Sequence, residues 1–191
     1  MKMTKRNLWL SNAWEDYFEI NPVRAGLRVK FDKGISCEVK IACKDFAKWL
    51  RKKYYFPIRV PIYFKNKKLL KSSAGEMCSA TFFGPYNKNV EPYIRVSVGD
   101  YNEMFREKGR MNAIYAIICS ITHELSHYYQ WIKDEKGFND EENDYFERQA
   151  LYYSKAIASD YYNDLYERGV LYQYINDLGN HNADSVRLNK N

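Results

Sequence analysis

The chain has 191 residues, of which 46% are hydrophobic and 28% charged, so its composition is that of a globular protein and excludes a disordered chain. Its net charge of +6 allows a weak attraction to anionic surfaces but does not demonstrate a nucleic-acid partner. The length favours one domain, which we place at residues 1–178, followed by a polar tail at 179–191 that we expect to fray.

The N-terminal residues do not resemble a sorting signal. The segment MKMTKRNLWLSNAWEDYF lacks the apolar core of a secretory signal, and we expect a short helix or an arm at Asn7–Glu19. No stretch approaches the roughly 18 apolar residues of a membrane helix. The four cysteines form no C-x-x-C pair, which favours reduced thiols over a structural zinc knuckle. We therefore expect a cytoplasmic protein with no membrane association.

Strand and helix patterns alternate along the first half of the chain. Alternating or β-branched residues predict strands at Ala25–Phe31, Ile58–Phe64, Ser79–Phe83 and Tyr93–Val98. Between the first two strands, Glu38–Tyr55 carries apolar residues at helical spacing. This half therefore supplies the strands of a sheet and one helix.

Helical patterns fill the second half. They cover a short segment near Tyr101–Lys108, a long one at about residues 111–132, a third at about residues 144–157 and a last one at about Ser159–Leu178. Either a break or only a kink separates the last two. Strands grouped ahead of helices predict an α+β domain, in which a small mixed or antiparallel sheet packs on the long helix and the helices after it.

The long helical segment contains the motif His123-Glu124-Leu125-Ser126-His127. Residues four apart lie on one face of a helix, so both imidazoles can bind one zinc ion at about 2.0–2.1 Å. Glu124 points about 100° away and can reach a metal-bound water without taking a coordination position. This is the H-E-x-x-H pattern, in which zinc polarises a water and the glutamate acts as general base.

The surroundings of the motif favour this interpretation over a chance occurrence, which we expect in roughly one chain of this length in a few hundred. One face of the segment carries a core stripe that includes Ile114 and Ile121, and the opposite face carries small residues such as Cys119 and Ser120 ahead of the histidines. The alternative is a pair of histidines on an exposed face, but exposed faces are usually rich in Lys and Glu.

A catalytic zinc site usually takes three protein ligands. Glu147 lies 20 residues after His127 on the next predicted helix, where an inward carboxylate can meet the two imidazoles across a helix hairpin. Four other residues compete for this position: Glu141, Glu142, Asp144 and His181. Asp144 could instead orient a histidine by accepting the N–H of its other ring nitrogen.

The motif and Glu147 together resemble the zincin metallopeptidases, in a minimal glutamate-zincin (gluzincin) form. Thermolysin-like members take a glutamate at this same separation as the third ligand. The resemblance covers roughly residues 58–160, and the chain departs from it by lacking a large C-terminal helical domain and the N-E-x-x-S-D signature around the third ligand. It implies Zn²⁺ on His123, His127 and Glu147, with Glu124 as the general base of peptide hydrolysis.

The resemblance also implies a polypeptide substrate that adds to a sheet edge above the metal helix. We expect the strand just before the helix to be that edge; its residues are Tyr93, Ile94, Arg95, Val96, Ser97 and Val98. Candidate donors to the developing oxyanion are Tyr152, Tyr153 and His181.

The sequence leaves three alternatives to a gluzincin-like peptidase. A SprT-like DNA-associated protease uses the same motif but takes a histidine as third ligand, and His181 is the one available. A degenerate zincin would bind zinc as a non-enzymatic interaction module, although such a site does not need Glu124. The basic stretch Lys48–Lys71 could bind nucleic acid, but we interpret it as a solvated surface.

Overall fold

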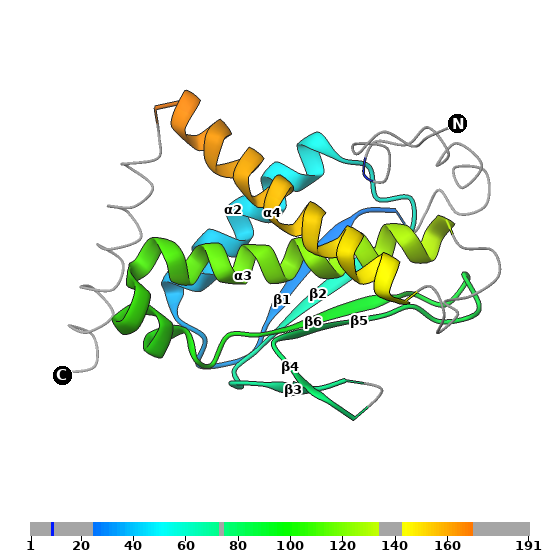
Figure 1. Cartoon of the computed structure of the whole chain (residues 1–191), viewed down its shortest axis with the longest axis horizontal. Coiled ribbons are helices and arrows are strands. Elements are labelled where there is room, and N and C mark those ends of the chain that lie inside the picture. Colours follow the sequence, from blue (N-terminus) through cyan, green and yellow to red (C-terminus); the bar gives the residue numbers. More distant parts are fainter. Residues whose placement is uncertain (1–8, 10–24, 73–74, 134–142, 170–191) are drawn as a thin grey trace.

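The computed structural model describes residue 9 and residues 25–72, 75–133 and 143–169 (Figure 1). Within these ranges the chain forms three helices, α2 (Cys37–Lys53), α3 (Tyr101–Lys133) and α4 (Asn143–Glu167). The strands are β1 (Leu27–Phe31), β2 (Val60–Lys65), β3 (Leu70–Lys71), β4 (Met77–Cys78), β5 (Ala80–Phe83) and β6 (Tyr93–Ser97). This confirms the predicted α+β class. The helix expected at Asn7–Glu19 and the tail expected at 179–191 lie outside the described residues.

The main sheet has the strand order β1-β2-β6-β5. Strands β1, β2 and β6 run parallel, and β5 is antiparallel to β6, so the sheet is mixed. Alternate residues such as Ile62, Ile94 and Val96 are buried on one face, which is the pattern of a sheet covered on one side. The helices lie on that side (Figure 1).

The expectation that Tyr93–Val98 forms the edge of the sheet is wrong. β6 pairs with β2 on one side and with β5 on the other, so both of its sides are occupied. The edge next to it is β5, whose Ala80 and Phe83 stand opposite Val96 and Tyr93. The position of a strand just before the helix in sequence does not determine whether that strand lies at the edge of the sheet.

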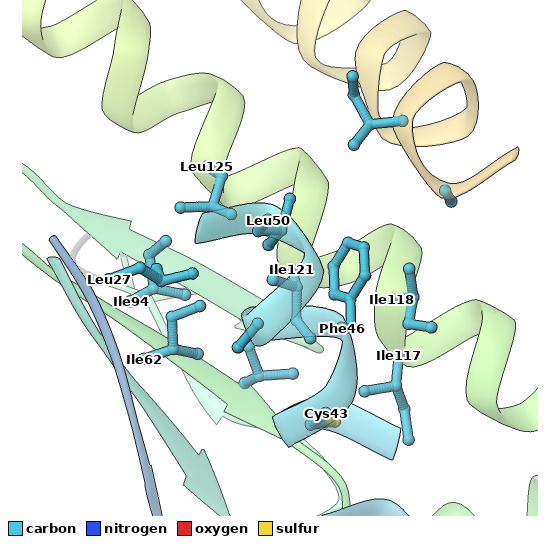
Figure 2. Packing of buried hydrophobic residues seen from close by; sticks show 14 of the residues in the cluster. Leu27, Cys43, Phe46, Leu50, Ile62, Ile94, Ile117, Ile118, Ile121 and Leu125 are labelled. Carbon is cyan, nitrogen blue, oxygen red and sulfur yellow. The ribbon is translucent and has the colours of Figure 1, made fainter. Parts of the chain in front are cut away.

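The core lies between the sheet and helices α2 and α3 (Figure 2). The strands contribute Leu27, Ile62 and Ile94, helix α2 contributes Phe46 and Leu50, and α3 contributes Ile117, Ile118, Ile121 and Leu125. The isoleucine stripe predicted for the long helix is therefore its buried face. Burying one such side chain stabilises the fold by about 1.5–3 kcal/mol. Because this face is held in the core, the opposite face, with the two histidines, turns toward α4.

Helix α3 contains a kink that joins two of the predicted helical segments. Gly109 has φ 78° and ψ 162°, a backbone conformation that glycine adopts without strain. Directly after it, Arg110 forms an ion pair of 2.5 Å with Glu38 of α2, whose side chain is fully buried. Burial and the neighbouring Glu38 carboxylate raise the pKa of Tyr101. These contacts fix where the long part of α3 begins.

Helix α4 packs antiparallel to α3. Residues late in α3 contact residues early in α4, as in the bond from Gln130 to Phe146, and earlier residues contact later ones, as in the bond from Thr122 to Ser154. Ala150 is fully buried, and a small residue at this position allows the helices to approach closely. The break or kink expected near residue 158 is absent, since α4 continues from Asn143 to Glu167.

The four cysteines, Cys37, Cys43, Cys78 and Cys119, are all free thiols. Within the described ranges, no helix combines the length and the apolar character needed to cross a membrane.

Candidate metal centre

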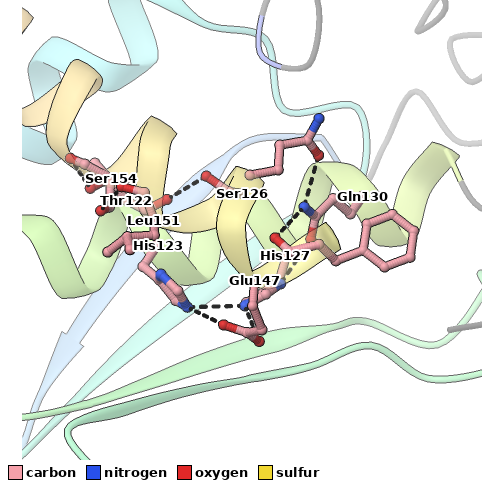
Figure 3. Close-up of polar contacts among 10 residues, drawn as sticks. Thr122, His123, Ser126, His127, Gln130, Glu147, Leu151 and Ser154 are labelled. Atoms are coloured by element: carbon pink, nitrogen blue, oxygen red, sulfur yellow. Dashed lines mark hydrogen bonds and ion pairs between the residues drawn. The ribbon is translucent and has the colours of Figure 1, made fainter. Parts of the chain in front are cut away.

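Three side chains from α3 and α4 converge on one point (Figure 3). The Nε2 atoms of His123 and His127 are 3.1 Å apart. Glu147 places Oε2 3.2 Å from His123 Nε2 and Oε1 3.2 Å from His127 Nε2. These three residues form a group whose donor atoms all lie close enough to hold one ion. The structure thus brings together the residues that the sequence predicted as ligands.

The spacing of these atoms fits a small tetrahedral metal. Zinc binds imidazole nitrogen and carboxylate oxygen at about 2.0–2.2 Å, and the donor atoms at the corners of such a tetrahedron are about 3.3–3.5 Å apart. The N–N separation of 3.1 Å, and the separation of 3.2 Å between each nitrogen and the Glu147 oxygen nearest to it, are each close to an edge of that tetrahedron. Two nitrogens and one carboxylate oxygen are also the donor set of many catalytic zinc sites, which leave the fourth corner open.

Of the four competing third ligands, the structure describes Asp144, which is not brought to this point. Asp144 is exposed and does not belong to the group of converging donors. At His127, the place that Asp144 could have taken, beside the second ring nitrogen, is occupied by Gln130. Glu141, Glu142 and His181 lie outside the described residues.

The electrostatics of the cluster favour the metal-binding protonation state of two of its three members, His123 and Glu147. Burial and the neighbouring His127 lower the pKa of His123, which keeps that imidazole neutral. Hydrogen bonds and charges from the histidines lower the pKa of Glu147, which keeps it ionised. Burial opposes ionisation of His127, but its hydrogen bond to Glu147 and the nearby carboxylates raise its pKa overall. Neutral imidazole and ionised carboxylate are the forms that bind metals.

Glu124 lies beside this cluster rather than in it. Its side chain is buried, and burial raises its pKa to about 7. Its carboxylate accepts a hydrogen bond from the backbone N–H of Phe82 on β5. Glu124 therefore connects the metal helix to the edge strand, and a carboxyl with a pKa near neutrality can both take up and release a proton.

Gln130 supports the centre from behind and was not predicted. Its Oε1 lies 2.8 Å from His127 Nδ1, where it can accept the N–H of that ring nitrogen and leave Nε2 free to bind a metal. Its Nε2 donates to the Phe146 carbonyl and to Gln149 Oε1 at 3.0 and 2.9 Å. The buried Gln130 amide thus orients His127 and bonds to α4, the helix that carries Glu147. Its position three residues after His127, on the same helix face, was the available signal.

Further along the same interface, Thr122 and Ser126 join the two helices to their surroundings. Thr122 Oγ1 lies 3.0 Å from the Ser154 carbonyl of α4 and 3.0 and 3.1 Å from the Ile118 and Cys119 carbonyls of its own helix, so its one hydrogen is shared among these acceptors. Thr122 and Ser154 are both buried. Ser126 Oγ donates to the Thr122 carbonyl at 2.9 Å and accepts the Trp9 indole N–H at 3.3 Å. The bond from Thr122 to Ser154 joins α3 to α4 near the ligands, and the bond from Trp9 to Ser126 joins residue 9 to α3.

The converging ligands open into a cleft of about 960 Å³. One wall is the segment Cys78–Gly84, which contains β5. The other wall is formed by the two helices: His123, Glu124, His127, Glu147, Leu151 and Ser154. An edge strand facing a metal helix across a cleft can hold an extended chain between them.

The candidate oxyanion donors on α4 are not in this cleft. Tyr152 and Tyr153 line a separate pocket of about 680 Å³. The reason is helical phase: Leu151 and Ser154 follow Glu147 by four and seven residues and face the cleft, so the two tyrosines between them turn away. The expectation for Tyr152 and Tyr153 is therefore wrong, and His181 lies outside the described residues.

Comparison of the chain with protein-family models, with curated proteins and with solved structures gives no significant match. What the protein does must therefore be inferred from its own residues and their geometry.

Proposed function

We propose that this protein is a zinc-dependent metallopeptidase that hydrolyses peptide bonds of a polypeptide substrate. The observation that carries the proposal is the convergence of His123, His127 and Glu147 with the buried carboxyl of Glu124 beside them. A site built only to bind zinc for structure has no use for a buried acid next to the ligands. We propose, further, that the sheet edge, the metal helix and the helix after it are arranged as in zincins, and that the protein works in the cytoplasm.

His123, His127 and Glu147 would hold the zinc ion. When bound, zinc supplies Lewis acidity: it lowers the pKa of a water and polarises a carbonyl. The two imidazole nitrogens and the carboxylate are donors that zinc prefers, and the separations between their atoms are close to those of donors around one zinc ion.

The chain's own residues would handle the protons and the orientation. Glu124 accepts a proton from the attacking water and returns it to the leaving amine, which suits a carboxyl whose pKa is about 7. The Phe82 N–H holds the Glu124 carboxylate in place during both steps. Gln130 keeps the His127 ring in the tautomer and direction that the metal requires.

The substrate would lie along β5. In a strand, the N–H groups of alternate residues point to the same side, so Ala80 and Gly84 direct theirs to the same side as Phe82. Because the Phe82 N–H bonds to Glu124 and not to β6, that side is the cleft side. A peptide in extended form can pair with these groups by strand addition, which brings its carbonyls past the metal centre.

The proposal is tested by measuring zinc and hydrolysis in the same preparations. Purified wild-type protein should hold about one zinc per chain by mass spectrometry and cleave fluorescein-labelled casein. Glu124→Gln should retain the zinc and lose activity by about 100- to 10,000-fold, because it removes the general base only. A Glu124→Gln protein with undiminished activity would contradict the mechanism.

The same preparations separate the alternatives. Wild-type protein that holds zinc but cleaves no unfolded protein would support the non-enzymatic interaction module. His181→Ala should retain full zinc, since Glu147 supplies the third donor. Loss of zinc in His181→Ala would favour the SprT-like arrangement, in which a histidine takes that position.

A further inference from the structure

The second face of the main sheet, away from the helices, has an unusual composition. A cross-strand row runs over all four strands: Lys30 stands opposite Tyr63, Tyr63 opposite Arg95, and Arg95 opposite Thr81. The neighbouring row pairs Tyr93 with Phe83. All these side chains are exposed or half-buried, and no helix of the described ranges covers them (Figure 1). Strand β3 approaches the face at Arg95, whose Nη2 donates to the Lys71 carbonyl at 3.0 Å.

The charges on this face are mainly positive. Its basic side chains, which alternate with the buried positions of the strands, are Arg28, Lys30, Arg59, Lys65 and Arg95. Two carboxylates reach it, and both are in ion pairs: Asp32 with Lys65 at 3.1 Å, and Glu91 with Arg59. Among the described residues, Arg28 and Lys30 have no carboxylate partner. A surface of this kind attracts a polyanion.

The same face carries three aromatic rings on adjacent strands. Phe83 and Tyr93 stack with centroids 4.8 Å apart and planes inclined by 23°, and Tyr93 meets Tyr63 edge-on at 6.2 Å. Lys30 and Lys65 place their ammonium groups 5.2 and 5.9 Å from the Tyr63 ring centroid. Phe83 is 42% exposed, so a large part of its apolar ring is not buried against the described residues.

We propose that this surface, the cationic sheet face (Arg28, Lys30, Tyr63, Lys65, Phe83, Tyr93 and Arg95), binds single-stranded nucleic acid. Bases stack on the rings, and phosphates lie against the basic side chains. Every base has a flat face that can stack, so this mode of binding tolerates many sequences. It requires neither the metal nor the cleft and stands independently of the proposed peptidase.

The rings distinguish a single strand from the other polyanions. In a duplex the bases are already stacked and only phosphates and groove edges are presented, so exposed rings add nothing. An acidic peptide meets the charges but has no bases for the rings. The face also reaches the metal cleft, because Thr81 and Phe83 line both. A bound strand would therefore lie beside the cleft and bring whatever is attached to it close to the metal centre.

The test is fluorescence anisotropy with labelled oligothymidylate of roughly 20 nucleotides, long enough for one such site. Binding is measured between about 50 and 200 mM salt. Oligouridylate of the same length separates a DNA preference from an RNA preference, and a duplex and polyglutamate serve as competitors. We expect the single strands to bind, with affinity that falls as salt rises, and the duplex and polyglutamate to compete poorly. Equal competition by either would overturn the proposal.

Two variants separate the charges from the rings. Arg28→Gln/Lys30→Gln should flatten the slope of log affinity against log salt by about 1.4, because each phosphate contact on a single strand contributes about 0.7. Phe83→Leu should weaken binding about 5- to 10-fold without changing that slope, because it removes stacking and no charge. Both sites are exposed, so the fold should persist, which circular dichroism and thermal unfolding check.

The matched control is Lys48→Gln/Lys52→Gln on the exposed surface of α2, which changes the net charge by the same amount. It should leave affinity within about twofold and the salt slope unchanged. Equal losses in the control and in Arg28→Gln/Lys30→Gln would show that only overall charge matters and would overturn the assignment to the cationic sheet face. So would wild-type protein that does not bind either single strand at low salt.

Discussion

The two helices that meet at the metal centre hold their side chains in different ways. Helix α3 carries His123, Glu124 and His127, and its other face is buried in the core, so the His127 side chain is only 12% exposed. Helix α4 contributes Glu147, whose side chain is 50% exposed. Near the centre, α4 is joined to α3 by hydrogen bonds from buried polar side chains, Gln130 and Thr122.

This difference separates the two tasks of a binding site. The positions of the imidazoles follow from the packing of α3, so a mutation that moves them also disturbs the fold. The position of the carboxylate follows from a few bonds between helices, so it can change while the fold persists. A ligand held in place before binding loses less freedom when the metal arrives. Zinc affinity should therefore respond to the contacts between α3 and α4 more strongly than stability does.

The largest effect is expected from removing an imidazole. His127→Ala should lower zinc affinity by about 100- to 1000-fold, because one of about four ligands supplies about 2.5–4 kcal/mol of a total near 10–16 kcal/mol. Glu147→Ala should lower it less, since its exposed position lets water take the vacated place. Competition with a chromogenic chelator measures both. Equal losses of zinc affinity in the two variants would show that Glu147 is held in place before metal binding as firmly as the histidines of α3.

The next effect concerns Gln130, the residue that links both helices. Gln130→Leu should weaken zinc binding about 10- to 100-fold, as is typical when the hydrogen-bond partner of a ligating histidine is lost. Gln130→Glu keeps an acceptor for His127 but cannot donate to Phe146 and Gln149, so it should recover part of the affinity. The same chelator competition gives both values. If Gln130→Glu binds zinc no better than Gln130→Leu, the bonds to α4 matter more than the tautomer of His127.

A smaller effect is expected from the interface one turn away. Thr122→Val removes the hydrogen bond to the Ser154 carbonyl and should lower the free energy of unfolding by about 1 kcal/mol. Urea denaturation measures it. The control is Ser120→Ala, because Ser120 Oγ bonds to the Ala116 carbonyl of its own helix and to nothing on α4 among the described residues. A loss as large in the control would mean that the Thr122 bond does not hold the helices together.

Local patterns were enough to predict the parts of this site that lie on one helix. The spacing of four places His123 and His127 on one face in any α-helix, and the isoleucine stripe identifies the face opposite. The place of Glu147 beside them followed from its separation along the chain and from the short connection between two helices. These features depend on residues near one another in sequence, which is where pattern and structure agree most directly.

The features that failed depend on contacts between distant segments. Proline within a strand usually indicates an edge strand or a bulge, yet β2, which contains Pro61, lies inside the sheet. The Val60 N–H bonds toward β1, so the missing N–H of Pro61 faces β6, one residue before the first β2–β6 pair at Ile62, and interrupts no hydrogen bond there. Likewise, the edge of the sheet depends on the pairing of β5 with β6, which the sequence pattern of one strand does not show. The role of Gln130 depends on its contacts with Phe146 and Gln149 of α4.

The smallest effect should come from the far end of the interface between the helices. Tyr115 and Ser159 bring their hydroxyl oxygens to 3.3 Å in an exposed position, and the Tyr115 ring packs against Tyr162. Tyr115→Phe keeps that packing and loses the hydroxyl, so unfolding should change by no more than about 0.5 kcal/mol and zinc affinity should not change. Urea denaturation and chelator competition on the same protein check both. A loss of zinc affinity beyond about twofold would mean that α4 moves as a rigid rod, so that the whole length of the interface, and not only Gln130 and Thr122, positions Glu147.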